Sequence, residues 1–268
     1  NVTGCASCGW FRFAAAWRKR QILNMPGVSV TLSSDSRPAP TAGDIPKRSA
    51  DQLHPVKPKD SASMLVLRKG AGGLEVLMGR RGRKAVFSNA YVFAGGKVDK
   101  TDIAPVPATP LDPDLERRIS SSPAKARIFA MAAVRETFEE TGLMLGAPGD
   151  LGRTGAQSWD EMRALGLAPT LGKLGYVGHA ITPASRAVRF NARFFCAWEE
   201  DMIGTLGGSG ELADLAYLPI QDALKLQMVD VTQFMLEEML RREDNGFATP
   251  TSYPFFGYRK DRRYHRYK

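Results

Sequence analysis

One helix, marked at its beginning, middle and end, limits most strongly how this 268-residue chain can fold. Ser122 followed by Pro123 is a strong start signal, because Ser caps free N–H groups and Pro fits the first helical position. Gly142 is a strong stop, since glycine adopts the left-handed conformation that ends many helices. The sequence therefore predicts a helix over 123–141. Its middle, residues 128–134, is apolar all round, so we expect the helix to be buried.

The end of the predicted helix concentrates negative charge. Glu136, Glu139 and Glu140 are spaced i,i+3 and i,i+4, which places them on one face. Negative charge at a helix C-terminus is disfavoured by the macrodipole, and the three carboxylates also repel one another. A divalent cation would offset both effects, and Mg²⁺ is typically held by a few carboxylates together with substrate phosphates. A solvated acidic helix end is the alternative, but the buried middle and the adjacent Arg135 argue against it.

The helix end resembles the signature of the Nudix hydrolase superfamily, G-x5-E-x7-R-E-U-x-E-E-x-G-U, where U is aliphatic. The matching residues are Gly96, Arg135, Glu136, Glu139, Glu140, Gly142 and Leu143. The resemblance extends over about residues 61–242 and implies a Nudix-type α/β/α sandwich with a mixed β-sheet. Independently, strands and helices without regular βα alternation favour the α+β class.

Three features depart from that signature. An extra stretch at about 97–122 separates Gly96 from the helix, and its prolines predict a loop that either covers the substrate or decorates the surface. Arg127 occupies the position of a Glu that, in the family, supports the fold by pairing with the signature Arg. The partner of Arg135 is therefore left open. Thr137 replaces an aliphatic residue.

A longer block narrows the resemblance. Residues 80–99, the insertion that follows and Ile181-Thr182-Pro183 are similar to a branch containing the peroxisomal coenzyme A diphosphatases of animals and many bacterial proteins. Ala94 stands where that branch has Pro, and the coenzyme A motif is only partly present. The resemblance implies hydrolysis of a nucleoside diphosphate linked to another moiety, with coenzyme A or acyl-coenzyme A first. ADP-ribose, dinucleotides and nucleotide sugars are the alternatives.

The resemblance also implies roles for individual residues. Glu136, Glu140 and the backbone carbonyl of Gly96 would bind Mg²⁺ or Mn²⁺. Glu139 would bind a further metal ion or orient the attacking water. Arg135 would orient the glutamates, or serve only as a structural ion pair. Glu211, which follows a glycine-rich loop, is the candidate base outside the helix, and a surface carboxylate is its alternative role.

A basic loop follows the second expected strand, residues 74–79. It contains Arg80, Arg81 and Arg83, which could bind substrate phosphates because guanidinium groups form paired hydrogen bonds with them. A solvated hairpin loop is the alternative interpretation. The expected small-molecule partner is a nucleoside diphosphate compound, and a homodimer is left open.

The net charge of +9 is concentrated at the two ends of the chain. Residues 1–60 hold nine basic and four acidic side chains, residues 247–268 hold six and one, and residues 61–246 hold 22 and 23. We therefore expect a basic, disordered N-terminal extension and linker at 1–60, a hydrolase domain at 61–246 and a basic C-terminal tail at 247–268. An over-long reading frame with its natural start at Met25 is an alternative for the first segment.

The basic ends allow a second function class. Aromatic rings interleaved with cations in the last residues are typical of contact with nucleic acid, and the N-terminal segment could contact a membrane surface. A nucleic-acid-binding Nudix module without catalysis is thus the alternative to an enzyme, and the three glutamates favour the enzyme. No stretch approaches the roughly 20 apolar residues of a membrane span. Three cysteines cannot build a disulfide framework, so we expect a cytoplasmic protein.

Overall fold

The structure is a computed structural model that describes residues 46–47, 49, 54–82, 89–260 and 262–268. The chain divides into two units between Ser36 and Arg37, and the fold reported below belongs to the second. Most of the expected N-terminal extension, together with Arg83 and Lys84, lies outside the described residues.

Within these residues nine strands form one mixed sheet in the order β10-β2-β1-β8-β7-β11-β12, with β3 paired to β2 and β4 to β1. The strands are β1 (Lys59–Gly70), β2 (Gly73–Arg81), β3 (Tyr91–Val92), β4 (Ala94–Lys97), β7 (Gly175–Ile181), β8 (Phe190–Trp198), β10 (Leu212–Pro219), β11 (Pro254–Arg259) and β12 (Arg262–Tyr267). The β1–β8 and β7–β11 pairs are parallel, and the other pairs are antiparallel. A smaller sheet has the order β6 (Leu167–Pro169), β5 (Leu143–Pro148), β9 (Met202–Gly204).

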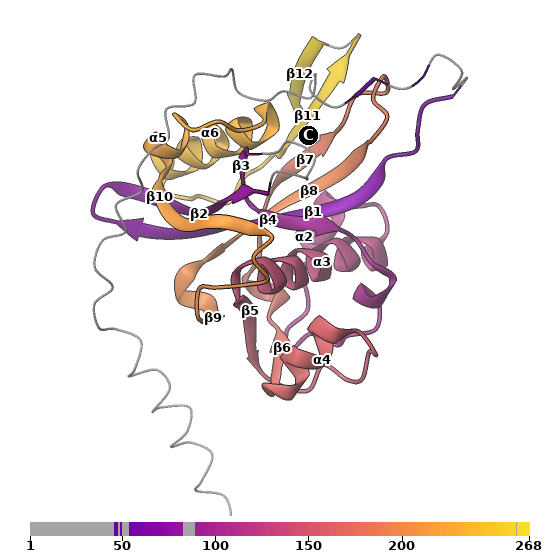
Figure 1. The fold of residues 1–268 in the computed structure, drawn as a ribbon, viewed down its shortest axis with the longest axis vertical. Coiled ribbons are helices and arrows are strands. Elements are labelled where there is room, and N and C mark those ends of the chain that lie inside the picture. The colour runs from indigo at the N-terminus through magenta and orange to yellow at the C-terminus, as the bar shows by residue number, and fades with distance from the viewer. Residues whose placement is uncertain (1–45, 48, 50–53, 83–88, 261) are drawn as a thin grey trace, which may run out of the picture. The chain divides into compact units, whose positions relative to one another are not determined.

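Helices cover both faces of the main sheet (Figure 1). The helices are α2 (Pro113–Ile119), α3 (Pro123–Thr141), α4 (Gln157–Ala164), α5 (Ile220–Ala223) and α6 (Asp230–Asp244), with the short 3₁₀ helices η2 (Lys100–Asp102), η3 (Leu171–Lys173) and η4 (Glu199–Asp201). None of the helices in the described part of the chain is long and apolar enough to cross a membrane.

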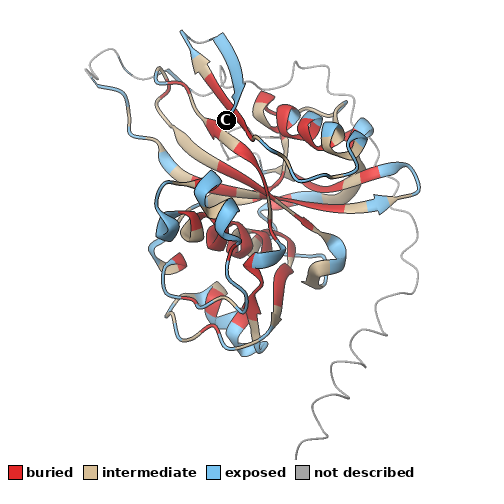
Figure 2. Cartoon of the chain, turned by 180° about the vertical axis from the view of Figure 1, so that it is seen from behind, coloured by how far each residue is buried: buried red, intermediate tan, exposed pale blue. Residues whose placement is uncertain are grey.

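The central strand β1 shows why two helical layers are needed. Successive side chains of a strand point to opposite faces of its sheet. Met64 and Val66 pack into the core that contains α3, whereas Leu65 and Leu67 pack into the core that contains α6. All four are almost completely buried, as the central strands in Figure 2 show. The apolar run of β1 therefore produces the expected α/β/α sandwich, and the expected α+β class with a mixed sheet is confirmed.

The predicted helix over 123–141 is α3, with the same bounds. The Ser122 hydroxyl accepts a hydrogen bond from the Lys125 backbone N–H at 3.4 Å, and Pro123 occupies the first turn. Gly142 has φ 73° and donates its N–H to the Phe138 carbonyl at 2.8 Å. The apolar middle is buried between β1, β4 and β5, so the helix end that carries the glutamates has a fixed position.

The insertion at 97–122 is more ordered than the loop expected from its prolines. It contains η2 and α2, and it buries Leu111 and Ile119 in the core around α3. Asp102, at the end of η2, is fully buried. Asp99 caps η2 in a capping box with Asp102, which fixes the turn that places this carboxylate. The insertion is thus part of the folded body.

The C-terminal segment also differs from the tail expected at 247–268. Strand β11 pairs in parallel with β7, and β12 pairs with β11, so both extend the main sheet. Tyr253, Phe255 and Phe256 are buried, and this apolar group explains why the segment folds onto the body. Some of its positive charge has internal partners, such as Arg263 with Asp230 at 2.8 Å.

Candidate active site

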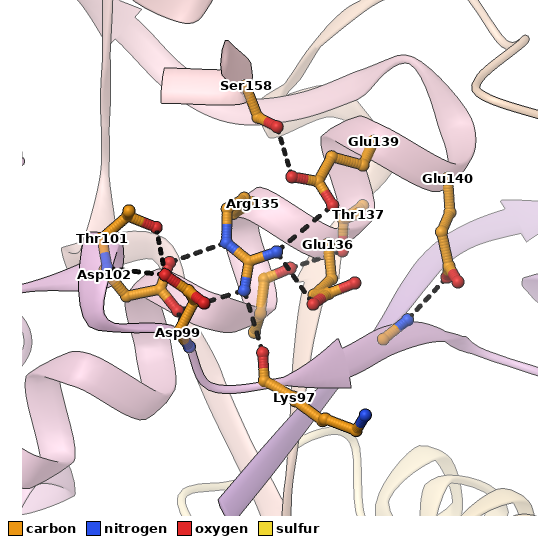
Figure 3. A network of polar contacts seen from close by, with 12 residues as sticks. Lys97, Asp99, Thr101, Asp102, Arg135, Glu136, Thr137, Glu139, Glu140 and Ser158 are labelled. Atoms are coloured by element: carbon orange, nitrogen blue, oxygen red, sulfur yellow. Dashed lines mark hydrogen bonds and ion pairs between the residues drawn. The ribbon is translucent and has the colours of Figure 1, made fainter. Parts of the chain in front are cut away.

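The guanidinium group of Arg135 lies at the centre of a polar network at the end of α3 (Figure 3). Its Nη1 donates to Glu136 Oε1 at 2.8 Å and to Glu139 Oε2 at 3.2 Å. Its Nη2 donates to the Lys97 carbonyl at 2.9 Å. The side chain therefore ties two of the three predicted glutamates to the backbone at the end of β4.

Asp102 is the main partner of Arg135. Its two carboxylate oxygens accept hydrogen bonds from Arg135 Nε at 2.7 Å and Nη2 at 3.1 Å, a bidentate arrangement. The indole N–H of Trp159 donates to the same carboxylate at 3.3 Å. Burial acts to lower the pKa of Arg135, but the hydrogen bond that it donates to Asp102 and the charge of Glu136 raise the pKa above its usual value. Arg135 therefore stays charged although it is buried.

Glu140 stands apart from this network (Figure 3). One carboxylate oxygen, Oε2, accepts the Gly95 backbone N–H at 2.8 Å, and the residue is only 3% exposed. Burial raises the pKa of Glu140 to about 8, and the charges of Glu136 and Glu211 act in the same direction. Burial likewise raises the pKa of Glu136. Burial thus makes both carboxylates costly to ionise, although Arg135 acts in the opposite direction on Glu136 and Arg81 does so on Glu140.

Both carboxylates line a cavity of about 750 Å³. The lining of this cavity also includes Gly95, Gly96, Arg81 and Glu211. At Gly96 a Cβ atom would collide with the carboxylate of Glu136, so only glycine permits this close approach of β4 to α3. Much of the remaining lining is apolar and aromatic, including Phe93, Phe190, Phe194, Phe256 and Tyr258.

The glycine-rich loop before Glu211 docks on the end of α3. The Gly207 N–H donates to the Thr141 carbonyl at 2.8 Å, and the Ser209 N–H donates to the Glu139 carbonyl at 2.9 Å. These carbonyls have no partner within a helix, so the loop caps it. Gly208 has φ 105°, and a Cβ there would collide with the Glu140 carbonyl. The glycines thus hold the chain against the helix end, and Glu211 follows at the cavity.

The predicted phosphate-binding arginines have different surroundings. Arg80 donates from Nε to Asp214 at 2.7 Å and from Nη1 to Asn89 at 3.2 Å, and it does not line the cavity. Arg81 lines the cavity, with Nη2 at 4.0 Å from Glu211 Oε1. The Nε atom of Arg81 is buried and has no hydrogen-bond partner among the described residues. Arg81 is therefore better placed than Arg80 to bind an anion.

The structure brings together Glu136, Glu140, Gly96 and Glu211 around one cavity. Glu139 does not line this cavity, because it faces Arg135 and accepts a hydrogen bond from the Ser158 hydroxyl. Sequence reasoning did not identify Asp102, Ser158 or Trp159 as members of the network. Asp102 lies six residues after Gly96, which is the G-x5-E spacing of the signature, so the signature's acidic position counted from the glycine would have indicated this partner. Counting back from Arg135 to Arg127 missed it, because the insertion lies between the acid and the helix.

A divalent cation at this cavity would have two protein carboxylates as ligands, those of Glu136 and Glu140. Within the described ranges, no three His, Cys, Asp or Glu side chains are arranged as a ready cation site. Mg²⁺, however, is usually bound through one or two protein carboxylates, with water and substrate phosphates completing its shell. Glu136 and Glu140 supply two such carboxylates in the lining of one cavity.

The raised pKa of Glu140 predicts a pH-dependent stability of the protein in EDTA. The folded pKa of about 8 lies above the ordinary value of 4.5, so between these values the folded state holds a proton that the unfolded state has lost. The stabilisation of the folded protein by this bound proton is complete below pH 4.5 and is lost as the pH rises through 8. Thermal unfolding should therefore show a steeper loss of Tm between pH 5 and 8.5 for wild type than for Glu140→Gln. Equal slopes for the two proteins would contradict the burial of this carboxylate.

No protein-family model matches the chain, and no curated protein matches it. Solved structures do match the chain. A Nudix hydrolase from Alicyclobacillus acidocaldarius matches with 25% identity and a TM-score of 0.53, over 68% of this chain and 90% of that one. A MutT protein from Bacillus halodurans matches with 15% identity and a TM-score of 0.43, over 78% and 97% of the two chains. A C. elegans Ap4A hydrolase matches with 14% identity and a TM-score of 0.40, over 70% and 98%.

Helices on both faces of a mixed sheet define an α/β/α scaffold, and the glutamate-bearing end of α3 lies at its cavity. The A. acidocaldarius structure identifies that scaffold as the Nudix fold. Because that structure is a Nudix hydrolase, the likeness supports an enzyme of the Nudix pyrophosphate hydrolase type.

Proposed function

We propose that this protein is a divalent-metal-dependent hydrolase that cleaves the diphosphate linkage of a nucleoside diphosphate joined to another moiety. One observation carries the proposal: the buried carboxylate of Glu140 and the partly buried carboxylate of Glu136 share a cavity with Arg81, whose Nε has no hydrogen-bond partner among the described residues. Carboxylates to hold a cation and a guanidinium to hold a phosphate are the complementary groups that a diphosphate needs.

Glu136, Glu140 and the backbone of Gly96 would hold Mg²⁺ or Mn²⁺. The bound ion would neutralise charge on the phosphoryl oxygens. Arg81, which lines the cavity, would donate hydrogen bonds from its guanidinium to a substrate phosphate. Arg135 would hold Glu136 and Glu139 in fixed orientations through Nη1.

Hydrolysis also needs a base. As water attacks one phosphorus atom, a new P–O bond forms, the bond to the bridging oxygen breaks and the water loses a proton. Glu211 would accept this proton, because its carboxylate is largely exposed on the cavity wall and the glycine loop fixes its backbone beside α3. Glu139 is the alternative base or water-orienting group, and its contacts with Arg135 and Ser158 would have to open for it to reach the cavity.

The apolar part of the cavity would bind the remainder of the substrate. A volume of about 750 Å³ lies in the usual range of ligand sites, roughly 300–1,000 Å³. The aromatic lining suits a nucleoside base or an apolar extension of the substrate. Coenzyme A and acyl-coenzyme A are the first candidates, followed by ADP-ribose, dinucleotides and nucleotide sugars.

A substrate panel tests this proposal. The full chain is incubated with each compound class in the presence of Mg²⁺ or Mn²⁺, and the products are identified by mass spectrometry. We expect two phosphate-containing products from at least one class, and no reaction in EDTA. Isotope from ¹⁸O-labelled water in one product shows which phosphorus is attacked. Absence of metal-dependent cleavage across the panel would contradict the proposal.

A nucleic-acid-binding role is the second candidate, based on the basic C-terminal residues. Deleting residues 247–268 would not test it cleanly, because β11 belongs to the main sheet and buries Phe255 and Phe256. Strand β12 has exposed cations suited to separate substitution, such as Arg262 and Arg266. The buried glutamates at the cavity favour the hydrolase.

A further inference from the structure

We propose that a second cavity binds a small organic anion, an aromatic body that carries a phosphate or carboxylate group. The cavity has a volume of about 810 Å³, within the roughly 300–1,000 Å³ that is usual for ligand sites. Its walls come from α2, the beginning of β7, the end of β8, the second half of α6 and the segment that follows α6. Among the described residues it shares no lining residue with the cavity that contains Glu136 and Glu140, so the proposal does not depend on the hydrolase function.

Two tyrosine hydroxyls of this cavity lack a hydrogen-bond partner among the described residues, those of Tyr176 and Tyr253. The two residues are only 3% and 7% exposed. Neither hydroxyl oxygen is completely enclosed, in contrast to the unpaired hydroxyl of Tyr217, so both can be reached from the cavity. Their ring centroids lie 5.1 Å apart, which brings the two side chains to the same part of the wall. Because buried polar groups are normally hydrogen-bonded, we expect a ligand to supply the missing acceptor.

Both hydroxyls act as donors at neutral pH. Burial raises the pKa of Tyr176 and the pKa of Tyr253 above the ordinary value of 10.0. The phenols therefore keep their protons, and a protonated phenol can donate a hydrogen bond. Hydrogen bonds to an ionised acceptor are roughly twice as strong as those between neutral groups, so an anionic group would gain most from these donors.

Arg118 adds a positive charge at the same place. Its guanidinium carbon lies 5.9 Å from the ring centroid of Tyr253, and its side chain is exposed. Arg118 forms no ion pair with an acidic side chain of the described residues. An anion that accepts a hydrogen bond from Tyr253 would therefore lie within reach of a guanidinium whose charge is unpaired.

The other charges in the lining already have partners. Arg242 donates from Nε to a buried glutamate at 2.8 Å, and its two terminal nitrogens donate to carbonyls of β7. Asp112 accepts two backbone N–H groups at the start of α2, and Asp114 pairs with Arg117. With three arginines and two aspartates the lining carries a net charge of +1. Arg118 is thus the charged group that remains available to an anion.

The remaining walls suit the apolar body of an organic anion. Trp198 and Phe247 contact each other edge to face, with ring centroids 5.1 Å apart. Leu174 and Met239 also line the cavity, and both are buried. Aromatic side chains provide flat surfaces on which a ring can pack. An inorganic ion would leave this apolar surface without a partner, so we expect a ligand with an aromatic body.

Isothermal titration calorimetry of the full chain in EDTA tests the proposal, with adenosine 5′-monophosphate and 2-naphthoate as probes. The first probe is an aromatic body with a phosphate, and the second is an aromatic body with a carboxylate. We expect at least one of them to bind. Tyr253→Phe keeps the ring and removes its hydroxyl, whereas Arg118→Gln removes the unpaired charge. Each substitution should lower the affinity by about 10-fold or more, the loss expected for one hydrogen bond to a charged group.

Two matched substitutions outside the cavity serve as controls. Tyr264→Phe removes an exposed hydroxyl on β12, and Arg163→Gln removes an exposed guanidinium on α4. Neither residue lines the cavity, so the affinity should stay within about twofold of wild type. Arg81→Gln should also leave unchanged the binding that Tyr253→Phe weakens, because Arg81 lines only the other cavity.

Three results would contradict the proposal. If neither probe binds wild type, or if either Tyr253→Phe or Arg118→Gln binds as tightly as wild type, the cavity is not an anion site. Binding that is lost in Arg81→Gln but retained in Arg118→Gln would place the ligand in the candidate active site instead. Inorganic phosphate that binds as tightly as adenosine 5′-monophosphate would show that the aromatic body contributes nothing. A preference between the two probes identifies the anionic group as a phosphate or a carboxylate.

Discussion

Replacing Glu140 by Gln should abolish metal-dependent hydrolysis while the protein stays folded. Glu140 lies on the cavity wall, is buried and contributes one of the two carboxylates proposed to hold the cation. The amide cannot supply the negative charge, so we expect turnover to fall by about 1,000-fold, comparable to the loss of a key electrostatic group in other active sites. The measurement is the initial rate with the best compound from the substrate panel at saturating Mg²⁺.

The same variant should be at least as stable as wild type in the absence of metal. The Gln side-chain oxygen can still accept the Gly95 N–H that Glu140 accepts at 2.8 Å. The substitution also removes the cost of ionising a buried carboxylate. Burial is the reason that the pKa of Glu140 is raised to about 8. We therefore expect the Tm of Glu140→Gln at pH 8.5 in EDTA to equal or exceed that of wild type. A loss of activity cannot then be attributed to unfolding.

Glu139→Gln tests the third carboxylate, which we also expect to be essential for turnover. Because Glu139 faces Arg135 and Ser158 rather than the cavity, the two variants should differ in Mn²⁺ binding. Glu140→Gln should lose more affinity than Glu139→Gln. The control is Glu237→Gln, an exposed position on α6 that pairs with Gln233. It should leave activity unchanged, and undiminished phosphate release from both Glu139→Gln and Glu140→Gln would overturn the proposed function.

The local signals in the sequence predicted α3 fully, because they act within a few residues. Ser122, Pro123 and Gly142 each determine a backbone conformation by their own chemistry, and the structure places the helix between them. Strand β1 does not alternate apolar and polar residues along its middle, because both faces of that strand are buried. A short continuous apolar run is the pattern of such a strand, and here it spans residues 64–67.

The partner of Arg135 was missed because the insertion separates it from the helix. Asp102 lies 33 residues before Arg135, although it keeps the six-residue spacing from Gly96 that the signature gives its acidic residue. The packing of Leu111 and Ile119 in the core around α3, together with hydrogen bonds from Arg127, brings the segment to the helix. The meeting of Arg81 and Glu211 at the cavity was also hard to predict from the sequence. It depends on the pairing of β2 with β10, two strands more than 100 residues apart.

The C-terminal strands β11 and β12 differ from the solvated tail that the composition predicted. The cations and tyrosines after Tyr258 indicated a solvated tail, and their exposure in β12 agrees with that composition. The strand is nevertheless formed, because Phe255 and Phe256 on β11 are buried and β12 pairs with β11 along its length. Cations along an edge strand also protect a sheet from pairing with other chains. Composition alone did not separate a charged edge strand from a tail.

Arg135→Met should cause the largest loss of stability of any single change at the site. The substitution leaves the carboxylate of Asp102, fully buried, without its cation and leaves Glu136 without the same partner. Breaking a buried ion pair on one side costs about 3–5 kcal/mol, which lowers Tm by on the order of 10 °C for a domain of this size. Chemical denaturation of the metal-free protein at pH 7 measures the difference in unfolding free energy directly.

Two further variants show whether this loss comes from the uncompensated charge. Arg135→Met combined with Asp102→Asn removes the unpaired buried carboxylate, so it should recover part of the stability lost in Arg135→Met alone. Arg163→Met removes an exposed pair with Asp150 at 3.3 Å and should cost no more than about 1 kcal/mol. If the double variant were less stable than Arg135→Met by the full cost of a second independent change, Arg135 and Asp102 would not act as a pair. The insertion would then be held by its apolar contacts, and Asp102 would have no special relation to the signature helix.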